Sequence, residues 1–190
     1  QRACIHGHVM GDVPRAMLLG PYFVAFAIQV LGLSNEQVTL LLSVIPLIVL
    51  ARYPFLDFIR ETPRIYPTLI ARANTILWLA VLLILPSSWF TLPFLIVIAT
   101  VYMIGNEFLQ NAVAPSLINE ITTKSDRGTF FGKMRTAKMA PSFFFALIGF
   151  FYVGDTMDRS EHRVLLLMAI GLCSYAIFWM AKIPATPPPD

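Results

Sequence analysis

Residues 92–114, LPFLIVIATVYMIGNEFLQNAVA, form an apolar run that is long enough to cross a lipid bilayer as one helix. The second half of this run nevertheless carries Asn106, Glu107, Gln110 and Asn111. Polar groups are costly in lipid, so these side chains should face protein or water. The run therefore predicts a membrane helix whose polar side is covered by the rest of the chain.

A charged connection, NEITTKSDRG at residues 119–128, separates this run from the next helix. That helix carries Lys133, Arg135 and Lys138 before it continues into the apolar residues 143–153. Two facing helices with opposite polar content indicate a bundle with a polar seam. Arg135 and Lys138 lie three positions apart on one face, where either could pair with a carboxylate of the preceding helix.

The composition is that of an integral membrane protein. Hydrophobic residues make up 57% of the chain and charged residues 13%, whereas about a quarter of an ordinary soluble domain is charged. An apolar excess of this size cannot be buried within 190 residues, so part of it must face lipid. The net charge of +3 fits basic cytoplasmic loops, and nothing in the sequence indicates nucleic-acid binding.

The apolar runs predict an all-α integral membrane protein, a bundle of six transmembrane helices over residues 16–182. A polar cytoplasmic segment (1–15) precedes the bundle, and a Pro-rich tail or linker (183–190) follows it. The predicted spans are residues 16–33, 38–55, 69–85, 92–114, 130–153 and 164–181.

Two local signals refine the first predicted helices. Gly20 and Pro21 interrupt the first run and predict a kink there, because proline cannot donate to the helical hydrogen-bond ladder. Ser34 and Gln37 follow in a short polar turn with the spacing of a capping box for the second helix. The short turn predicts that these two helices are antiparallel neighbours.

Lysine and arginine are concentrated in alternate connections. The N-terminal segment and the second and fourth connections each hold two of them, the first and third connections hold none, and the fifth holds Arg159 and Arg163 among acidic residues that nearly cancel their charge. Basic loops usually lie in the cytoplasm, so both termini are expected there. We expect a multi-pass protein of a bacterial inner membrane or an equivalent membrane.

The loop between the second and third predicted helices resembles that of the major facilitator superfamily of secondary transporters. The family carries a Gly-x-x-x-Asp-Arg-x-Gly-Arg-Arg pattern there, and Asp57 can take the aspartate position. Tyr53, Phe58 and Arg60 replace the first glycine, the arginine and the second glycine. The aspartate and the basic character given by Arg60 and Arg64 are what remains of the motif.

The fourth connection carries the more specific similarity. Residues 114–120, APSLINE, together with Arg127, Gly128 and Gly132, resemble the family's fourth connection in the order of proline, acidic residue, Arg-Gly and a further glycine. The Pro-rich tail stands where the linker to the family's second half begins. The whole chain thus resembles the N-terminal six-helix half of this family, or a half-length relative.

The resemblance implies a secondary transporter for a small solute. In that family one six-helix half rocks against another, so this chain would need a second transporter half, a second copy or a larger membrane assembly. The alternative is a non-transporting structural or assembly subunit of a larger membrane complex. Some relatives of the superfamily are associated with the assembly of photosynthetic pigment proteins, which illustrates that use.

Candidate residues for a coupling site and a substrate path come from the polar positions of the predicted helices. The candidates for proton coupling, or for a fixed buried ion pair, are Glu107, Arg135 and Lys138. Substrate-path candidates, whose alternative role is to bond a neighbouring helix, are Tyr22, Gln29, Asn106, Gln110 and Asn111.

The cytoplasmic loops supply a third set of candidates. A gate or latch that holds one access state would use Asp57, Arg60, Arg64 and Arg127. Their alternative role is ordinary positive loop charge.

No enzyme motif is present in the sequence. There is no Gly-x-Ser-x-Gly elbow, no His-Glu-x-x-His and no P-loop, so we expect no enzymatic activity and no cofactor. Cys4, His6 and His8 alternate in an N-terminal segment that we expect to be unstructured, which is a weak basis for a metal site, and we expect no metal. The two cysteines, Cys4 and Cys173, form no disulfide pattern.

Overall fold

The structure is a computed structural model that describes residues 2–50, 62–106, 114–152 and 159–185. Within these ranges it contains helices and no strand, which confirms the predicted all-α fold. The elements in chain order are α1 (Arg2–Leu19), α2 (Pro21–Gln29), α3 (Asn35–Leu50), α5 (Ile65–Ile84), the short 3-10 helix η2 (Ser87–Trp89), α6 (Leu92–Met103), α7 (Ala114–Ile121), α8 (Arg127–Tyr152) and α9 (Arg159–Met180).

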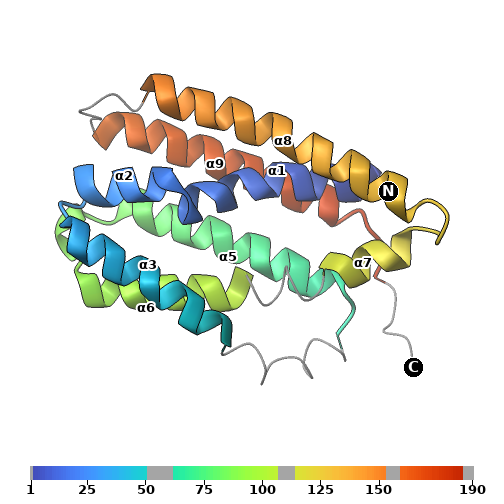
Figure 1. Cartoon of the computed structure of the whole chain (residues 1–190), viewed down its shortest axis with the longest axis horizontal. Coiled ribbons are helices and arrows are strands. Elements are labelled where there is room, and N and C mark those ends of the chain that lie inside the picture. The colour runs from blue at the N-terminus through green and yellow to red at the C-terminus, as the bar shows by residue number, and fades with distance from the viewer. Residues whose placement is uncertain (1, 51–61, 107–113, 153–158, 186–190) are drawn as a thin grey trace.

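The long helices run back and forth along the longest axis of the molecule (Figure 1). The N-terminus, the start of α5, the connection from α7 to α8 and the end of α9 lie at one end. The connections from α2 to α3 and from α5 to α6 lie at the other end. The basic residues Arg64, Lys124 and Arg127 belong to the first of these ends. At the opposite end, residues 30–34 and 85–91 contain no lysine or arginine, but the start of α9 carries Arg159 and Arg163.

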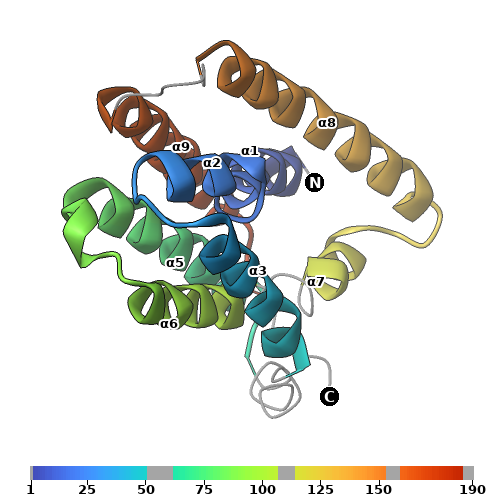
Figure 2. The same ribbon diagram turned by 60° about the vertical axis from the view of Figure 1, so that its left-hand side comes forward.

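Helix α1 lies in the middle of the bundle, with α9, α8 and α5 packed around it (Figures 1 and 2). This differs from the prediction that residues 1–15 form an unstructured segment before the bundle. Cys4, Val9 and Val13 are buried and recur at helical spacing, so they form an apolar stripe that the flanking charges obscure in the sequence. The helix therefore begins at Arg2 and not at residue 16.

The predicted interruption of the first run is present. Gly20 adopts an extended conformation between α1 and α2, and Pro21 occupies the first turn of α2, where its missing N–H group breaks no helical hydrogen bond. The capping box is also present, because the Ser34 backbone N–H donates to Gln37 Oε1 over 2.9 Å and the Gln37 N–H donates to Ser34 Oγ over 3.2 Å. Helix α3 accordingly begins at Asn35, directly after its cap.

Two large apolar clusters lie in the described part of the interior, one towards each end of the bundle, and a small third cluster contains Tyr102 and Met103. The cluster nearer the α2–α3 connection includes Met17, Phe26, Leu41, Leu79, Leu95 and Leu166. The cluster nearer the N-terminus includes Cys4, Ile65, Leu117, Phe130 and Met180. Between these two clusters α1 carries the buried His8 and α5 carries the buried Thr68, Arg72 and Thr75, while on α9 the buried Cys173 bonds the Arg72 carbonyl. A polar layer therefore separates the two large apolar clusters.

Two of the described helices are long and apolar enough to cross a membrane: residues Ile65–Ile84 and Ser160–Met180. Residues Leu92–Asn106 form a shorter apolar helix. Helices α1 and α8 carry charged residues along their length, which is why they do not have the composition of an isolated membrane span. The structure thus shows an all-helical bundle with two candidate spans, where the sequence predicted six.

Candidate functional site

A fully buried arginine lies in the polar layer of the bundle. Arg72 belongs to α5, and its side chain is 0% exposed. Its guanidinium donates to the carbonyl of Gly11, and its Nη2 lies 3.2 Å from Oδ1 of Asp12, both on α1. A Cβ on residue 11 would overlap this guanidinium, so glycine is the residue that lets Arg72 approach the α1 backbone.

Asp12 joins three helices through its two carboxylate oxygens. While Oδ1 faces Arg72 on α5, Oδ2 lies 2.5 Å from Nζ of Lys138 on α8. The Lys138 side chain is 32% exposed, so this ion pair lies at the edge of the polar layer and not within it. A carboxylate between two cations is held ionised, and it stabilises the buried guanidinium that would otherwise be uncompensated.

Further polar groups surround the buried arginine. Cys173 on α9 donates its thiol hydrogen to the Arg72 carbonyl over 3.3 Å. His8, one turn before Asp12 on α1, is 2% exposed. The polar layer therefore takes side chains from α1, α5, α8 and α9, and it connects the helices that pack around α1.

An open groove of about 570 Å³ runs beside this layer, between α8 and the region where α1 passes into α2. The charged side chains that line it, among the residues that the structure describes, are one carboxylate, Asp12, and three cations, Arg15, Arg135 and Lys138. Ala16, Gly20, Pro21 and Met139 complete its walls. A space of this size is typical of sites that bind small organic molecules.

The structure brings two of the three predicted coupling residues together. Arg135 and Lys138 both line the groove, as their spacing on one face of a helix indicated. The carboxylate that pairs with Lys138 is Asp12, and Glu107 lies outside the described residues. Sequence reasoning missed Asp12 and Arg72 because each stands alone among apolar neighbours, and their helices lie far apart in the chain.

Asn106, a substrate-path candidate, forms a bond between helices. It is fully buried, and its Nδ2 donates to Thr75 Oγ1 on α5 over 2.8 Å. One turn away Asn74 Nδ2 donates to the carbonyl of Tyr102 over 3.3 Å, which adds a second link from α5 to α6. These contacts correspond to the alternative role, in which a polar side chain bonds a neighbouring helix. Gln110 and Asn111 lie outside the described residues.

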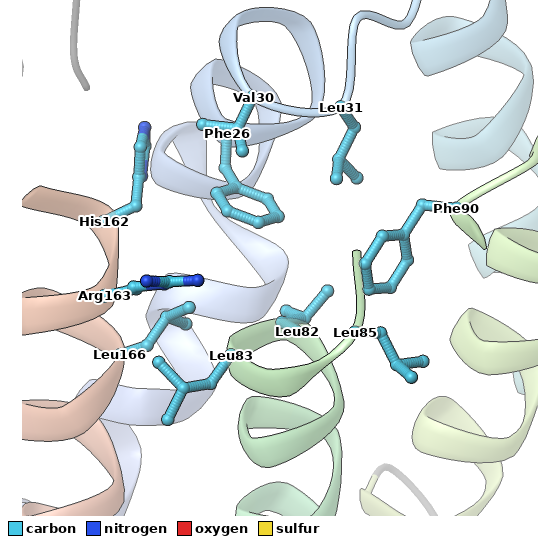
Figure 3. A pocket seen from close by; sticks show the side chains of 10 residues that line it. All are labelled: Phe26, Val30, Leu31, Leu82, Leu83, Leu85, Phe90, His162, Arg163 and Leu166. Atoms are coloured by element: carbon cyan, nitrogen blue, oxygen red, sulfur yellow. The ribbon is translucent and has the colours of Figure 1, made fainter. Parts of the chain in front are cut away.

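Tyr22 lies away from the groove, near the end of the bundle that holds the α2–α3 connection. Its hydroxyl is 2.9 Å from Nδ1 of His162 on α9, and the His162 ring also packs edge-on against Phe26. Figure 3 shows the small hollow beside this contact, whose walls are aliphatic and aromatic apart from His162 and Arg163. Gln29, the remaining path candidate, is exposed on α2 and lines neither space.

The latch candidates are described only in part. Arg127 Nη2 donates to the carbonyl of Asn119 over 3.2 Å, so it ties the start of α8 to α7 across their connection. Arg64 is half-buried just before α5. Asp57 and Arg60 lie outside the described residues.

The residues of the N-terminal Cys-His cluster point to different surroundings. Cys4 is buried in the apolar cluster, His8 is buried near Arg72, and the His6 ring stacks on Trp179 at a centroid distance of 4.9 Å. In the described part of the chain no three His, Cys, Asp or Glu side chains form a group that could hold a metal ion.

Fold and site together define a helical bundle with a buried ionic layer and a basic groove on one side. In comparisons with protein-family models, with curated proteins and with solved structures, no match to this chain was found. Its function is therefore argued from the groove, the polar layer and the apolar surface.

Proposed function

We propose that this chain is a transporter-like membrane protein, a six-span helical half of the major-facilitator type that moves a small solute together with a second six-helix unit. The observation that carries the proposal is the position of the basic groove. Lys138 lies close to the middle of the 26-residue α8, and Asp12 and Arg15 lie close to the middle of the segment formed by α1 and α2. Half-way along a membrane bundle, such a groove is at the depth of the acyl chains.

Charged side chains at that depth cannot face lipid without a large cost. Placing one arginine or lysine at the centre of a membrane helix costs about 2.5–3.5 kcal/mol on insertion scales. Arg135 is exposed and Lys138 is about one-third exposed in the single chain, so both would incur this cost in a lipid-facing groove. Water and a second protein unit on this side would remove the cost, as in transporters whose site lies between two halves.

The opposite surfaces of the bundle have the character expected of a lipid contact. Most of the large exposed side chains on α5, α6 and α9 are aliphatic or aromatic, among them Ile70, Leu77, Val97, Leu167 and Phe178, although Arg163 on α9 is also exposed. The charged groove thus contrasts with the largely apolar exposed surfaces of α5, α6 and α9. This asymmetry favours a bundle that faces lipid on its apolar sides and a protein partner across the groove.

The distribution of basic residues supports an orientation for the proposed bundle. The connection before α5 and the connection between α7 and α8 carry Arg64, Lys124 and Arg127 at the end that holds the N-terminus. Basic connections usually stay in the cytoplasm. In the proposed topology both termini are cytoplasmic.

The stoichiometry of the particle in native membranes tests the proposal. We expect the chain, extracted in mild detergent, to elute as a unit with twelve membrane helices, made of two copies or of this chain and a second half. Native mass spectrometry measures the composition. Quenching by a bromine-labelled lipid of a tryptophan introduced in the groove wall by Met139→Trp measures whether the groove contacts lipid. A single chain surrounded by lipid on all sides, with the groove in contact with acyl chains, would refute the proposal.

A structural or assembly subunit of a larger membrane complex remains the second candidate function. The observation that favours it is the exposed apolar surface of α8, which includes Phe131, Met139, Phe143 and Phe144. Such a surface suits a permanent contact with another membrane protein as well as it suits lipid. Stoichiometric copurification with a multi-chain assembly, combined with no solute flux in vesicles, would favour this function over transport.

A further inference from the structure

We propose that the groove between α1 and α8 binds a small organic anion through Arg135 and Lys138, so that the solute carries a carboxylate or phosphate group. This inference deepens the proposed transport function, and it rests on that function only for the step from binding to movement.

The charge of the groove is unbalanced. Among the described residues that line it, Arg135 and Lys138 on α8 are cationic, and the one carboxylate belongs to Asp12. That carboxylate contacts both the buried Arg72 at 3.2 Å and Lys138 at 2.5 Å, so its single negative charge balances one of these two cations, and Arg135 adds a further positive charge. The surplus positive charge attracts an anion and repels a cation, and the partly enclosed walls strengthen both effects.

The geometry of α8 suits two-point recognition. Arg135 and Lys138 are three positions apart on one helix face, so their charged groups repel each other, and a shared anion would relieve that repulsion. The guanidinium offers paired N–H donors to a carboxylate or phosphate, and the ammonium has three donors, of which Asp12 occupies one. Arg15 approaches the same space from α1.

The remaining walls indicate an organic ligand. Ala16, Pro21 and Met139 present apolar surface next to the cations. With about 570 Å³ available, a small carbon skeleton can contact these residues while its anionic group contacts α8.

A lipid headgroup is a poorer occupant than a soluble anion. Lys138 is about 16 Å along α8 from Arg127, at a rise of about 1.5 Å per residue. Arg127 begins α8 at the end where a headgroup would lie, so the groove is well inside the bundle. A soluble anion can reach that depth through an aqueous path, whereas a headgroup would draw its acyl chains across the charged walls.

The test measures binding and flux separately on the full chain in phosphatidylcholine nanodiscs and vesicles. Isothermal titration with inorganic phosphate, citrate and benzoate is compared with glucose and choline at constant ionic strength. Protection of the Lys138 amine from an amine-reactive reagent, read by mass spectrometry, locates the site. The variants are Arg135→Gln and Lys138→Gln, with Lys133→Gln as the matched control, because Lys133 is an exposed cation of the same helix that does not line the groove.

We expect at least one anion to bind saturably and to protect Lys138. Arg135→Gln should weaken that binding by about tenfold or more, as the loss of one charge-assisted hydrogen bond predicts. Arg135→Lys should restore part of it, and Lys133→Gln should leave it unchanged. Arg135 is exposed, so this variant tests the site even where Lys138→Gln impairs folding.

Three results would overturn the inference. The first is an equal loss of anion affinity in Arg135→Gln and Lys133→Gln, and the second is equal affinity for glucose and for the anions. The third is that phosphatidylglycerol nanodiscs protect the Lys138 amine and no soluble anion does. Anion binding without flux in vesicles would support the inference and contradict transport. Flux of a neutral solute that is insensitive to Arg135→Gln would support transport and contradict the anion-binding inference.

Discussion

Asp12 and Arg72 lie 60 positions apart in the sequence, and their side chains meet at 3.2 Å in the middle of the bundle. The arginine is completely buried, and the second oxygen of the same carboxylate contacts Lys138. The Asp12 side chain on α1 thus contacts both α5 and α8 and fixes their positions along the bundle relative to α1. This contact gives the first test of the structure.

Asp12→Asn should destabilise the protein strongly. The variant leaves the Arg72 charge buried without a counterion, and removing one partner of a buried ion pair usually costs about 3–5 kcal/mol. Thermal unfolding in detergent measures the effect. Asp126→Asn is the control, because Asp126 lies in an exposed connection and accepts a hydrogen bond from Thr123, so its change should stay within about 0.5 kcal/mol. Equal stability of the two variants would mean that Arg72 is not buried against α1.

Gly11→Ala should displace the buried guanidinium. The added Cβ would overlap Arg72, and overpacking of this kind costs about 1–3 kcal/mol. Gly171→Ala on α9 is the matched control, since nothing lies within 4 Å of its added Cβ. Alanine is the better helix former by about 1 kcal/mol, so the control should be neutral or stabilising. Unfolding midpoints that rise in both variants would contradict the close approach of α5 to α1.

Cysteine labelling should place Asn35 and Lys124 on opposite sides of the membrane. Both residues are exposed, and they lie at opposite ends of the bundle. In intact cells a membrane-impermeant maleimide should label Asn35→Cys, whereas Lys124→Cys and Lys182→Cys should react only after permeabilisation. The native cysteines, Cys4 and Cys173, are buried and should give little background. Labelling of Asn35→Cys and Lys124→Cys from the same side would refute the topology.

Glu107→Gln should abolish proton-coupled uptake while folded protein remains in the membrane. A carboxyl group in a membrane helix is a candidate for carrying the coupled proton, and the amide cannot replace it. Uptake into energised vesicles, normalised to the amount of protein, measures the effect. Glu36→Gln, on the exposed first turn of α3, is the control. Uptake that is equal in the Glu107 and Glu36 variants would remove Glu107 from the mechanism.

Local signals in the sequence predicted the all-α class, parts of several described helices and one helix cap, but not α7, which lies in the predicted fourth connection. Apolar runs marked the interiors of α5, α6 and α9, and Ser34 with Gln37 marked the start of α3. The boundaries differ because hydropathy detects only the apolar part of a helix. Helix α1 was missed for the same reason, since Asp12 and Arg15 interrupt its buried stripe.

The site was less predictable than the fold. The spacing of Arg135 and Lys138 indicated one face, and both line the groove. Their relation to Asp12 and Arg72 depends on how three helices pack, and no local pattern encodes it. Asn106 is a second example. Its place in an apolar run suggested a substrate path, but its bond to Thr75 could not be predicted because it depends on how α5 packs.

In the proposed membrane topology, the burial of Arg72 also has a consequence for biogenesis. A guanidinium keeps its charge under physiological conditions, and at the centre of a membrane helix it opposes release from the translocon by about 2.5–3.5 kcal/mol. Helix α5 is therefore a weaker insertion signal on its own than its other residues suggest. Because α1 is synthesised first, its carboxylate is already available when α5 emerges from the ribosome, and the order of synthesis supplies the counterion before it is needed.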